Sequence, residues 1–222
     1  MKSFQQYLDE GVNDPAIFKA IFLAGGPGSG KSFIVGKTAL QALGFRLINS
    51  DPAFEAALKK AGLSMDPGDI GSEKGQEIRA KAKALTAKQM ELALKGRLGL
   101  IIDGTGKDYF KIAEQVNELR KIGYAVHMIF VNTDLDTAIA RNNARARSLP
   151  EPMVTKMWNG VQKNIGKFQN LFRDRMIIID NSDGANYEGG VMSAYRKISK
   201  WSKQPPENRN AKKWIELQKK SK

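Results

Sequence analysis

The stretch that decides the fold is residues 25–32, which read Gly25-Gly26-Pro27-Gly28-Ser29-Gly30-Lys31-Ser32. It matches the pattern G-x-x-x-x-G-K-[ST] in full. The apolar run 20–24 before it is typical of a strand buried on both faces. Residues 33–43 after it have a helical pattern that ends at Gly44. The stretch therefore predicts a tight turn between a buried strand and a helix, in which glycines let the backbone approach an anion.

Each residue type in this motif has a physical role in binding a phosphate group. Successive backbone N–H groups form a nest for anions at the start of a helix, where the helix dipole also favours phosphate. The Lys31 ammonium can reach the β- and γ-phosphates of a nucleotide, and the Ser32 hydroxyl can ligate Mg²⁺. We therefore expect residues 25–33, ending with Phe33, to bind ATP or another NTP with Mg²⁺. The alternative is an ordinary glycine-rich turn, and the complete match with its flanking strand and helix argues against it.

Composition sets the outer bounds. The chain has 222 residues, 41% of them hydrophobic, which suits one α/β domain with a sizeable core. It has no cysteine, which excludes disulfides, cysteine-ligated zinc and thiol catalysis. The apolar runs have strand length, so we expect no membrane span and a cytoplasmic location. The net charge of +13 favours a nucleic-acid partner, with a purely solubilising surface as the alternative.

Apolar runs that alternate with helical patterns continue after the first strand. The expected further strands are 45–48, 98–102, 124–131 and 176–180. This alternation predicts an α/β fold with a doubly wound, parallel, five-stranded sheet, helices on both faces and the site at the strands' carboxyl ends. We expect a helical extension over 1–17, with a short helix at 3–10, the main domain over 18–202 and a basic tail over 203–222.

Two aspartates follow expected strands directly, where phosphates would lie. Asp103 closes strand 98–102 and is placed to hold the Mg²⁺ shell, with a turn residue before Gly104 as the alternative. Asp51 lies just after strand 45–48 and is a candidate catalytic residue. It also suits the start of a helix before Pro52, and the two roles are compatible.

The later helices carry arginines and lysines whose partners the sequence leaves open. Arg141 and Arg145 lie one helical turn apart, and no carboxylate lies three or four residues from either, so they repel each other slightly unless an anion lies between them. The alternative is that both pair with surface carboxylates. The helix 73–95 has an excess of cations, which is typical of a solvated face or of a surface that meets a polyanion. The apolar pattern of 153–172, with Trp158, predicts core packing. His127, on strand 124–131, is expected to be a core residue.

The order of these motifs supports a resemblance over residues 18–181. Beyond residues 25–32, the residues that carry it are Phe45-x-x-Ile48-Asn49-x-Asp51, Ile101-Ile102-Asp103-Gly104-Thr105 and Ala140-Arg141-Asn142-x-x-Arg145. Together they resemble the P-loop kinases, and within them the polynucleotide kinase and zeta-toxin branch, which includes phage-type DNA and hydroxymethyluracil-DNA kinases. The resemblance implies transfer of the ATP γ-phosphate to a hydroxyl of a nucleic acid, favouring DNA, or of a small molecule as in zeta toxins. It implies that Asp51 is the general base, Arg141 and Arg145 are lid cations, and Thr105 contacts the substrate.

One position departs from the polynucleotide kinase pattern. Those enzymes have an arginine three residues after the aspartate, and this chain has Phe54. An aromatic side chain there either contacts the substrate by stacking on a base or belongs to the core, and both remain open. A third function, an NTP-driven switch with no acceptor, would not need the carboxylate of Asp51.

Overall fold

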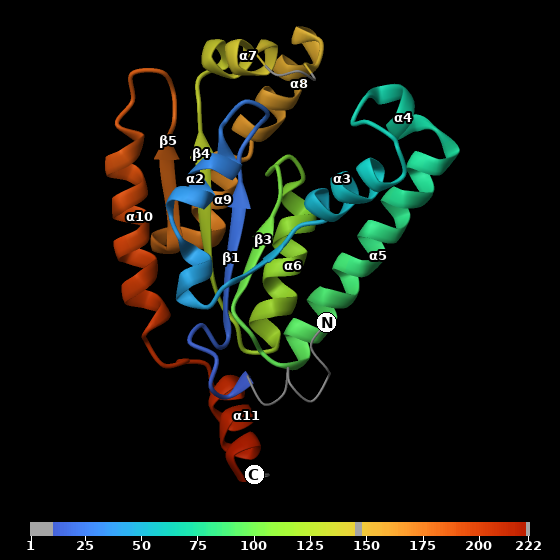
Figure 1. The fold of residues 1–222 in the computed structure, drawn as a ribbon. Helices are drawn as coiled ribbons and strands as arrows, with labels where there is room; N and C mark the ends of the chain where they lie inside the picture. The colour runs from blue at the N-terminus through green and yellow to red at the C-terminus, as the bar shows by residue number, and fades with distance from the viewer. Residues whose placement is uncertain (1–10, 145–147, 221–222) are drawn as a thin grey trace.

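The computed structural model describes residues 11–144 and 148–220. Its strands form one parallel five-stranded sheet in the order β2-β3-β1-β4-β5 (Figure 1). The strands are β1 (Lys19–Ala24), β2 (Arg46–Ile48), β3 (Leu100–Asp103), β4 (Ala125–Asn132) and β5 (Met176–Asp180). Their carboxyl ends meet at one edge, so the predicted fold class is confirmed.

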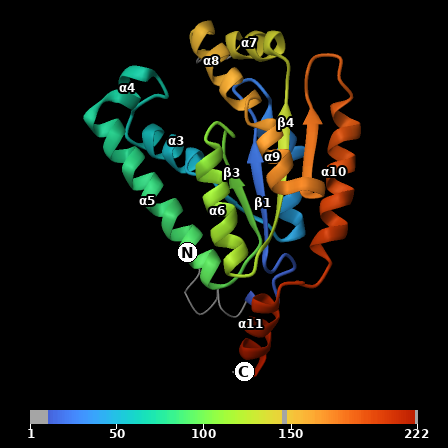
Figure 2. The ribbon, with the colours of Figure 1, turned by 180° about the vertical axis from the view of Figure 1, so that it is seen from behind.

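Alternate side chains of the strands serve two separate cores. Phe22 and Phe130 point to the face covered by α6 (Tyr109–Lys121) and α9 (Ile165–Phe172), which Figure 2 shows from behind. Ile21 and Ile129 point to the face covered by α2 (Lys31–Lys37) and α10 (Tyr187–Ser202). Because both faces are buried, the central strands are apolar throughout.

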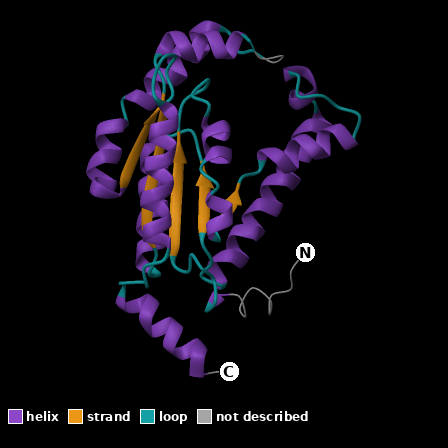
Figure 3. Cartoon of the chain, turned by 60° about the vertical axis from the view of Figure 1, so that its left-hand side comes forward, coloured by secondary structure: helices purple, strands orange, loops and turns teal. Residues whose placement is uncertain are grey.

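Three helices between β2 and β3 form an arm beside the sheet (Figure 3). They are α3 (Asp51–Lys60), α4 (Pro67–Gly71) and α5 (Glu73–Lys95), whose bounds match the predicted helix 73–95. The arm has a small core of its own, made of Phe54, Leu58, Ile70 and Ala82. The arm rises toward the carboxyl edge, and α7 (Leu135–Asn143) and α8 (Glu151–Gln162) lie above the P-loop at the top of the view (Figure 1).

The C-terminal helix α11 (Arg209–Lys220) packs against the start of β1. Its Ala211 is fully buried, and the Trp214 ring meets the Phe18 ring edge to face at 5.5 Å. His127 is buried, so its predicted core position is confirmed. The predicted helix 3–10 lies outside the described residues. Within the described residues, no helix combines the length and apolar character needed to cross a membrane.

The single helix predicted over 153–172 is wrong, because the structure divides it into α8 and α9. The division falls at Asn164, a buried residue whose amide donates hydrogen bonds to the carbonyls of Gly106 and Lys107, at 3.0 and 2.8 Å. These carbonyls belong to the loop after β3, so the side chain ties that loop to the turn between the helices. The helix predicted over 33–43 also ends early, at Lys37, and a short 3₁₀ turn (Leu40–Leu43) follows it.

We expect Asn164→Ala to lower the free energy of unfolding by about 1–3 kcal/mol, because it leaves one buried and one partly buried carbonyl without their donor. Thermal unfolding of the variant measures this. Asn170→Ala, an exposed asparagine on α9, is the matched control and should change stability by less than about 0.5 kcal/mol. Equal melting temperatures for the two variants would contradict the assigned role of Asn164.

Candidate active site at the P-loop

The loop between β1 and α2 has the backbone geometry of an anion nest. Gly28 and Gly30 both have φ of 74°, a left-handed conformation that glycine adopts without strain. A Cβ on Gly28 would lie 2.4 Å from the carbonyl oxygen of Ala138, and one on Gly25 would lie 2.7 Å from Ser29 Oγ. Side chains at positions 25 and 28 would therefore collide with their surroundings, which fits a close approach of this backbone to a phosphate.

A series of contacts runs from the P-loop lysine to the candidate base. Lys31 Nζ lies 3.0 Å from Asp103 Oδ1, and the Asn49 amide donates to Asp103 Oδ2 at 2.8 Å. The Asn49 side-chain oxygen then accepts from the backbone N–H of Asp51 at 2.8 Å. Asp51 is the first residue of α3 and is exposed, so its carboxylate is available to a substrate. The fold thus links all three predicted residues, and Asn49 is the connecting residue to which sequence reasoning gave no role.

The surroundings of Asp103 fit a cation. Its Oδ1 is buried and accepts no hydrogen bond within the described residues, so the neighbouring Lys31 ammonium is the charge that balances it. Ser32 stands exposed in the first turn of α2. Mg²⁺ takes one or two protein oxygens together with phosphate oxygens and water, and Ser32 and Asp103 suit this demand. Among residues 11–144 and 148–220 no cluster of three or more metal-binding side chains occurs, so an all-protein metal cage is not formed there.

Arg141 lies beside the P-loop and already has an acidic partner. Its guanidinium donates to the carbonyl of Asn181 at 2.7 Å and to Asp183 Oδ1 at 2.9 Å. Asn181 in turn donates to the carbonyl of Ser29 at 2.8 Å, which joins the loop after β5 to the P-loop. For Arg141 the structure therefore has the alternative, a carboxylate partner, which comes from a distant loop rather than from its own helix. Its predicted partner Arg145 lies outside the described residues.

Core packing is confirmed for most of the apolar pattern of 153–172, including Val161, Phe168 and Phe172, but Trp158 is half-buried and lies beside the P-loop. Its indole N–H donates to the carbonyl of Thr133 at 2.8 Å, just after β4. A Cβ on Gly26 would lie 3.9 Å from Trp158. The apolar period of α8 could not reveal this, because a residue on a helix edge satisfies the same pattern as a core residue.

Three further predicted residues have distinct surroundings. Phe54 is 3% exposed in the core of the arm, with the Arg79 guanidinium 5.1 Å from its ring, so the core alternative is the one found. Thr105 is exposed, and its carbonyl accepts from the Gly25 N–H at 3.1 Å, which places it next to the P-loop. Phe33 is 48% exposed on α2, the helix that follows the P-loop.

A family model described as "AAA domain" matches residues 21–165, more than half of the chain. The chain belongs to this AAA domain family. The match includes the P-loop, Asp51, Asp103 and Arg141. Nucleotide binding at the P-loop is therefore a family property of this AAA domain protein, in agreement with the geometry of its loop. No curated protein matches its sequence.

Solved structures share the P-loop kinase-like fold of this AAA domain protein at low sequence identity. The AvrRxo1-ORF1:ORF2 structure with ATP has a TM-score of 0.55 at 14% identity, covering 88% of this chain and 71% of that chain. A chain of the Pnkp1/Rnl/Hen1 RNA repair complex has a TM-score of 0.51 at 17% identity, covering 68% and 46%. A putative kinase from Chloroflexus aurantiacus has a TM-score of 0.50 at 14% identity, covering 80% and 97%.

Proposed function

We propose that this protein is an ATP-dependent kinase of the polynucleotide kinase and zeta-toxin branch, which transfers the γ-phosphoryl group of ATP to a hydroxyl. The observation that carries the proposal is the contact series Lys31–Asp103–Asn49–Asp51. It connects the backbone of Asp51, whose carboxylate is exposed, to the lysine that would meet the γ-phosphate. A nucleotide-driven switch has no use for a carboxylate held there, whereas an acceptor hydroxyl needs a proton acceptor.

The proposed transfer needs positioning and charge neutralisation more than covalent chemistry. The Asp51 carboxylate accepts the proton of the acceptor hydroxyl. At the same time, the oxygen of that hydroxyl forms a bond to the γ-phosphorus. The bond between that phosphorus and the β,γ-bridging oxygen breaks, and ADP leaves with the electron pair. Lys31 and the P-loop amides bind the phosphate oxygens. A magnesium ion, held by Ser32 and Asp103, would neutralise phosphate charge when it is bound.

The lid role of Arg141 is part of the proposal. The guanidinium lies beside Gly30, with Nη1 3.8 Å from where a Cβ on that residue would lie. Its ion pair with Asp183 is largely exposed and therefore weak, so a nucleotide phosphate can compete with it. We propose that Arg141 and Arg145 close over the transferring phosphate, as the resemblance implies.

We propose a nucleic acid as the acceptor, favouring DNA, on the grounds of the net charge of +13 and the exposed cations of α5. Lys83 and Lys88 on α5 are exposed, and neither forms an ion pair or a side-chain hydrogen bond within the described part of the chain. Lys81 and Lys95 form ion pairs with Glu77 and Glu91, so the cationic face is narrower than its composition indicates.

A small-molecule acceptor is the second candidate, and the burial of Phe54 favours it. The polynucleotide kinases have an arginine at that position to hold a substrate phosphate, and this chain has a core residue there. ATP labelled at the γ-phosphate, offered separately to DNA, RNA, nucleosides and sugars, tests the two candidates. Label in a strand end or hydroxylated base supports the first, and label in a sugar or nucleoside supports the second. Release of inorganic phosphate alone, with every acceptor, would contradict the kinase proposal.

The nucleic-acid proposal predicts a steep salt dependence. Each phosphate neutralised contributes about −0.9 to the slope of log affinity against log salt on duplex DNA. Lys83→Gln with Lys88→Gln should therefore flatten the slope by about 1.8. Arg196→Gln with Lys203→Gln, two exposed cations on or next to α10, are the matched control and should leave the slope unchanged. Identical slopes for both double variants would contradict the role of α5.

We propose that the basic C-terminal tail also contacts the nucleic acid, and this role is tested by substitutions rather than by a deletion. Residues of α11 pack against Phe18, so removing the helix would expose the core as well as remove charge. Replacing the exposed Lys212 and Lys213 by glutamine changes charge alone, and their effect on the same slope tests the tail.

A further inference from the structure

A hollow lies at the edge of the sheet opposite the P-loop. It has a volume of about 740 Å³ and is lined at the amino ends of β1 and β4, among others by Lys19 and His127. The linker 204–208 between α10 and α11 closes one side. Small-molecule pockets commonly measure about 300–1,000 Å³, so the hollow has the size of a binding site.

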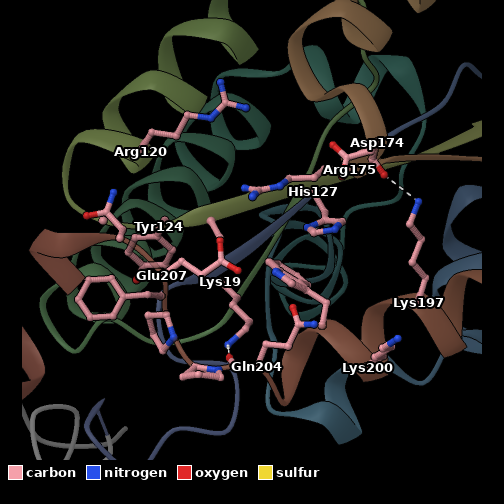
Figure 4. A pocket seen from close by; sticks show the side chains of 17 residues that line it. Lys19, Arg120, Tyr124, His127, Asp174, Arg175, Lys197, Lys200, Gln204 and Glu207 are labelled. Carbon is pink, nitrogen blue, oxygen red and sulfur yellow. Dashed lines mark hydrogen bonds between the residues drawn. The ribbon is translucent and has the colours of Figure 1, made fainter. Parts of the chain in front are cut away.

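The lining is strongly basic. Among the described residues that line it, five are lysine or arginine and two are acidic. The cations come from separate elements: Arg120 from α6, Arg175 from the turn before β5, and Lys197 and Lys200 from α10 (Figure 4). Because α6 and α10 cover opposite faces of the sheet, these charges surround the hollow rather than line one helix face.

Several of these cations have no counter-ion. The side chains of Arg175 and Lys200 make no ion pair or hydrogen bond within the described chain, and neither Asp174 nor Glu207 forms an ion pair there. Lys197 and Arg120 donate only to backbone carbonyls, at 2.7 and 3.1 Å. The hollow therefore holds five cations against two carboxylates, which leaves a net positive charge in its lining.

Two buried groups complete the site. Lys19 is 3% exposed, and its ammonium donates to the carbonyl of Gln204 at 2.7 Å. His127 is 5% exposed, and its Nδ1 has no hydrogen-bond partner in the described residues. The His127 ring lies against the indole of Trp201, with 3.9 Å between ring centres. Burial, followed by the charges of Arg175 and Lys197, lowers the pKa of His127 to about 3. The imidazole is therefore neutral near pH 7.

We propose that this hollow binds a small molecule that carries two or more linked phosphates. Linked phosphates match the spread of the cations, because Arg120 and Lys200 come from helices that cover opposite faces of the sheet. Guanidinium groups bind phosphate in bidentate fashion, and Arg175, placed between the other cations, is the central contact. The site is separate from the P-loop and does not depend on the proposed kinase activity.

The tryptophans allow binding at the hollow and binding at the P-loop to be measured separately. The chain has three tryptophans: Trp201 lines the hollow, Trp158 flanks the P-loop, and Trp214 lies on α11. In ¹⁵N-labelled protein, each indole N–H signal is assigned by replacing that tryptophan with phenylalanine. Inorganic tripolyphosphate should shift the Trp201 signal in a saturable way, whereas sodium chloride at equal ionic strength should not. ATP is the second probe: tighter binding at Trp201 than tripolyphosphate would assign a nucleotide, and equal binding would assign the phosphate chain alone.

Arg175→Ala should raise the dissociation constant read at Trp201 by about tenfold to a hundredfold, the range for a lost charged hydrogen bond. Arg196→Ala, which removes an exposed arginine outside the hollow, is the matched control and should change it by less than about twofold. Unchanged indole signals in the unliganded variants verify their folding, and Lys200→Ala serves if Arg175→Ala does not fold. Two results would overturn the proposal. One is that tripolyphosphate shifts the Trp201 signal no more than sodium chloride does. The other is that Arg175→Ala and Arg196→Ala change the dissociation constant equally.

Discussion

Asp51→Asn is expected to lower phosphoryl transfer by roughly two to four orders of magnitude while ATP binds as before, because an amide cannot accept the acceptor's proton. The backbone N–H of Asp51, which holds the start of α3 against Asn49, is unaffected by the change. ATP affinity and turnover, measured on the same preparation, separate the two effects. The loss should appear in kcat rather than in the affinity for ATP.

Glu55→Gln is the matched control for Asp51→Asn. It removes an exposed carboxylate one turn further along α3, so it changes the charge of the helix start without reaching the proposed reaction. A carboxylate that only stabilises the helix terminus contributes about 0.3–1 kcal/mol to folding. Turnover close to that of the unmodified protein in Asp51→Asn would reduce Asp51 to that helical role and would remove the main support for the kinase proposal.

Lys31→Ala is expected to reduce transfer by at least about 10³-fold, since losing even a single neutral hydrogen-bond donor to developing charge costs roughly 10²–10³. The variant also leaves Asp103 without its balancing ammonium. The ion pair is only partly buried, so the loss of folding stability should be smaller than the roughly 3–5 kcal/mol of a fully buried pair. Turnover and thermal unfolding measure the two consequences.

A double variant distinguishes catalysis from stability in this experiment. Lys31→Ala with Asp103→Asn removes both charges, so it should recover much of the lost stability without recovering transfer. Lys37→Ala, an exposed lysine at the end of α2, should change neither. Unchanged transfer in Lys31→Ala would refute the assignment of the P-loop as the site of phosphoryl transfer.

The sheet could be predicted from sequence because its information is local. The motif at 25–32 specifies a strand before it and a helix after it, and each later strand is a short apolar run between helical patterns. The break at Asn164 could not be predicted, because its cause is a pair of carbonyls 57 and 58 residues away. Helical periodicity records which face is apolar, and it does not record a side chain that leaves the helix to bind a distant loop.

The candidate site divides in the same way. Lys31, Asp51 and Asp103 could be chosen because each follows a strand that ends at the same edge of the sheet. Asn49 was visible in the motif around Asp51, yet its role depends on Asp103, 54 residues further along the chain. The ion pair of Arg141 with Asp183 likewise spans 42 residues. Contacts of this kind follow from the order of the strands in the sheet, which a single sequence does not specify.

The separate core of the arm has a consequence for how acceptor choice can change. Phe54, Leu58, Ile70 and Ala82 pack with one another and belong to neither core of the sheet. Mutations in that cluster can therefore remodel the arm with little effect on the strands that hold the P-loop. Two places join the arm to the sheet: the root of α5, where Ala93 enters the sheet core, and the start of α3, where the Asp51 N–H donates to Asn49. Under the proposed function, the outer part of the arm can therefore change its shape, and with it the choice of acceptor, while the strands that hold the P-loop stay the same.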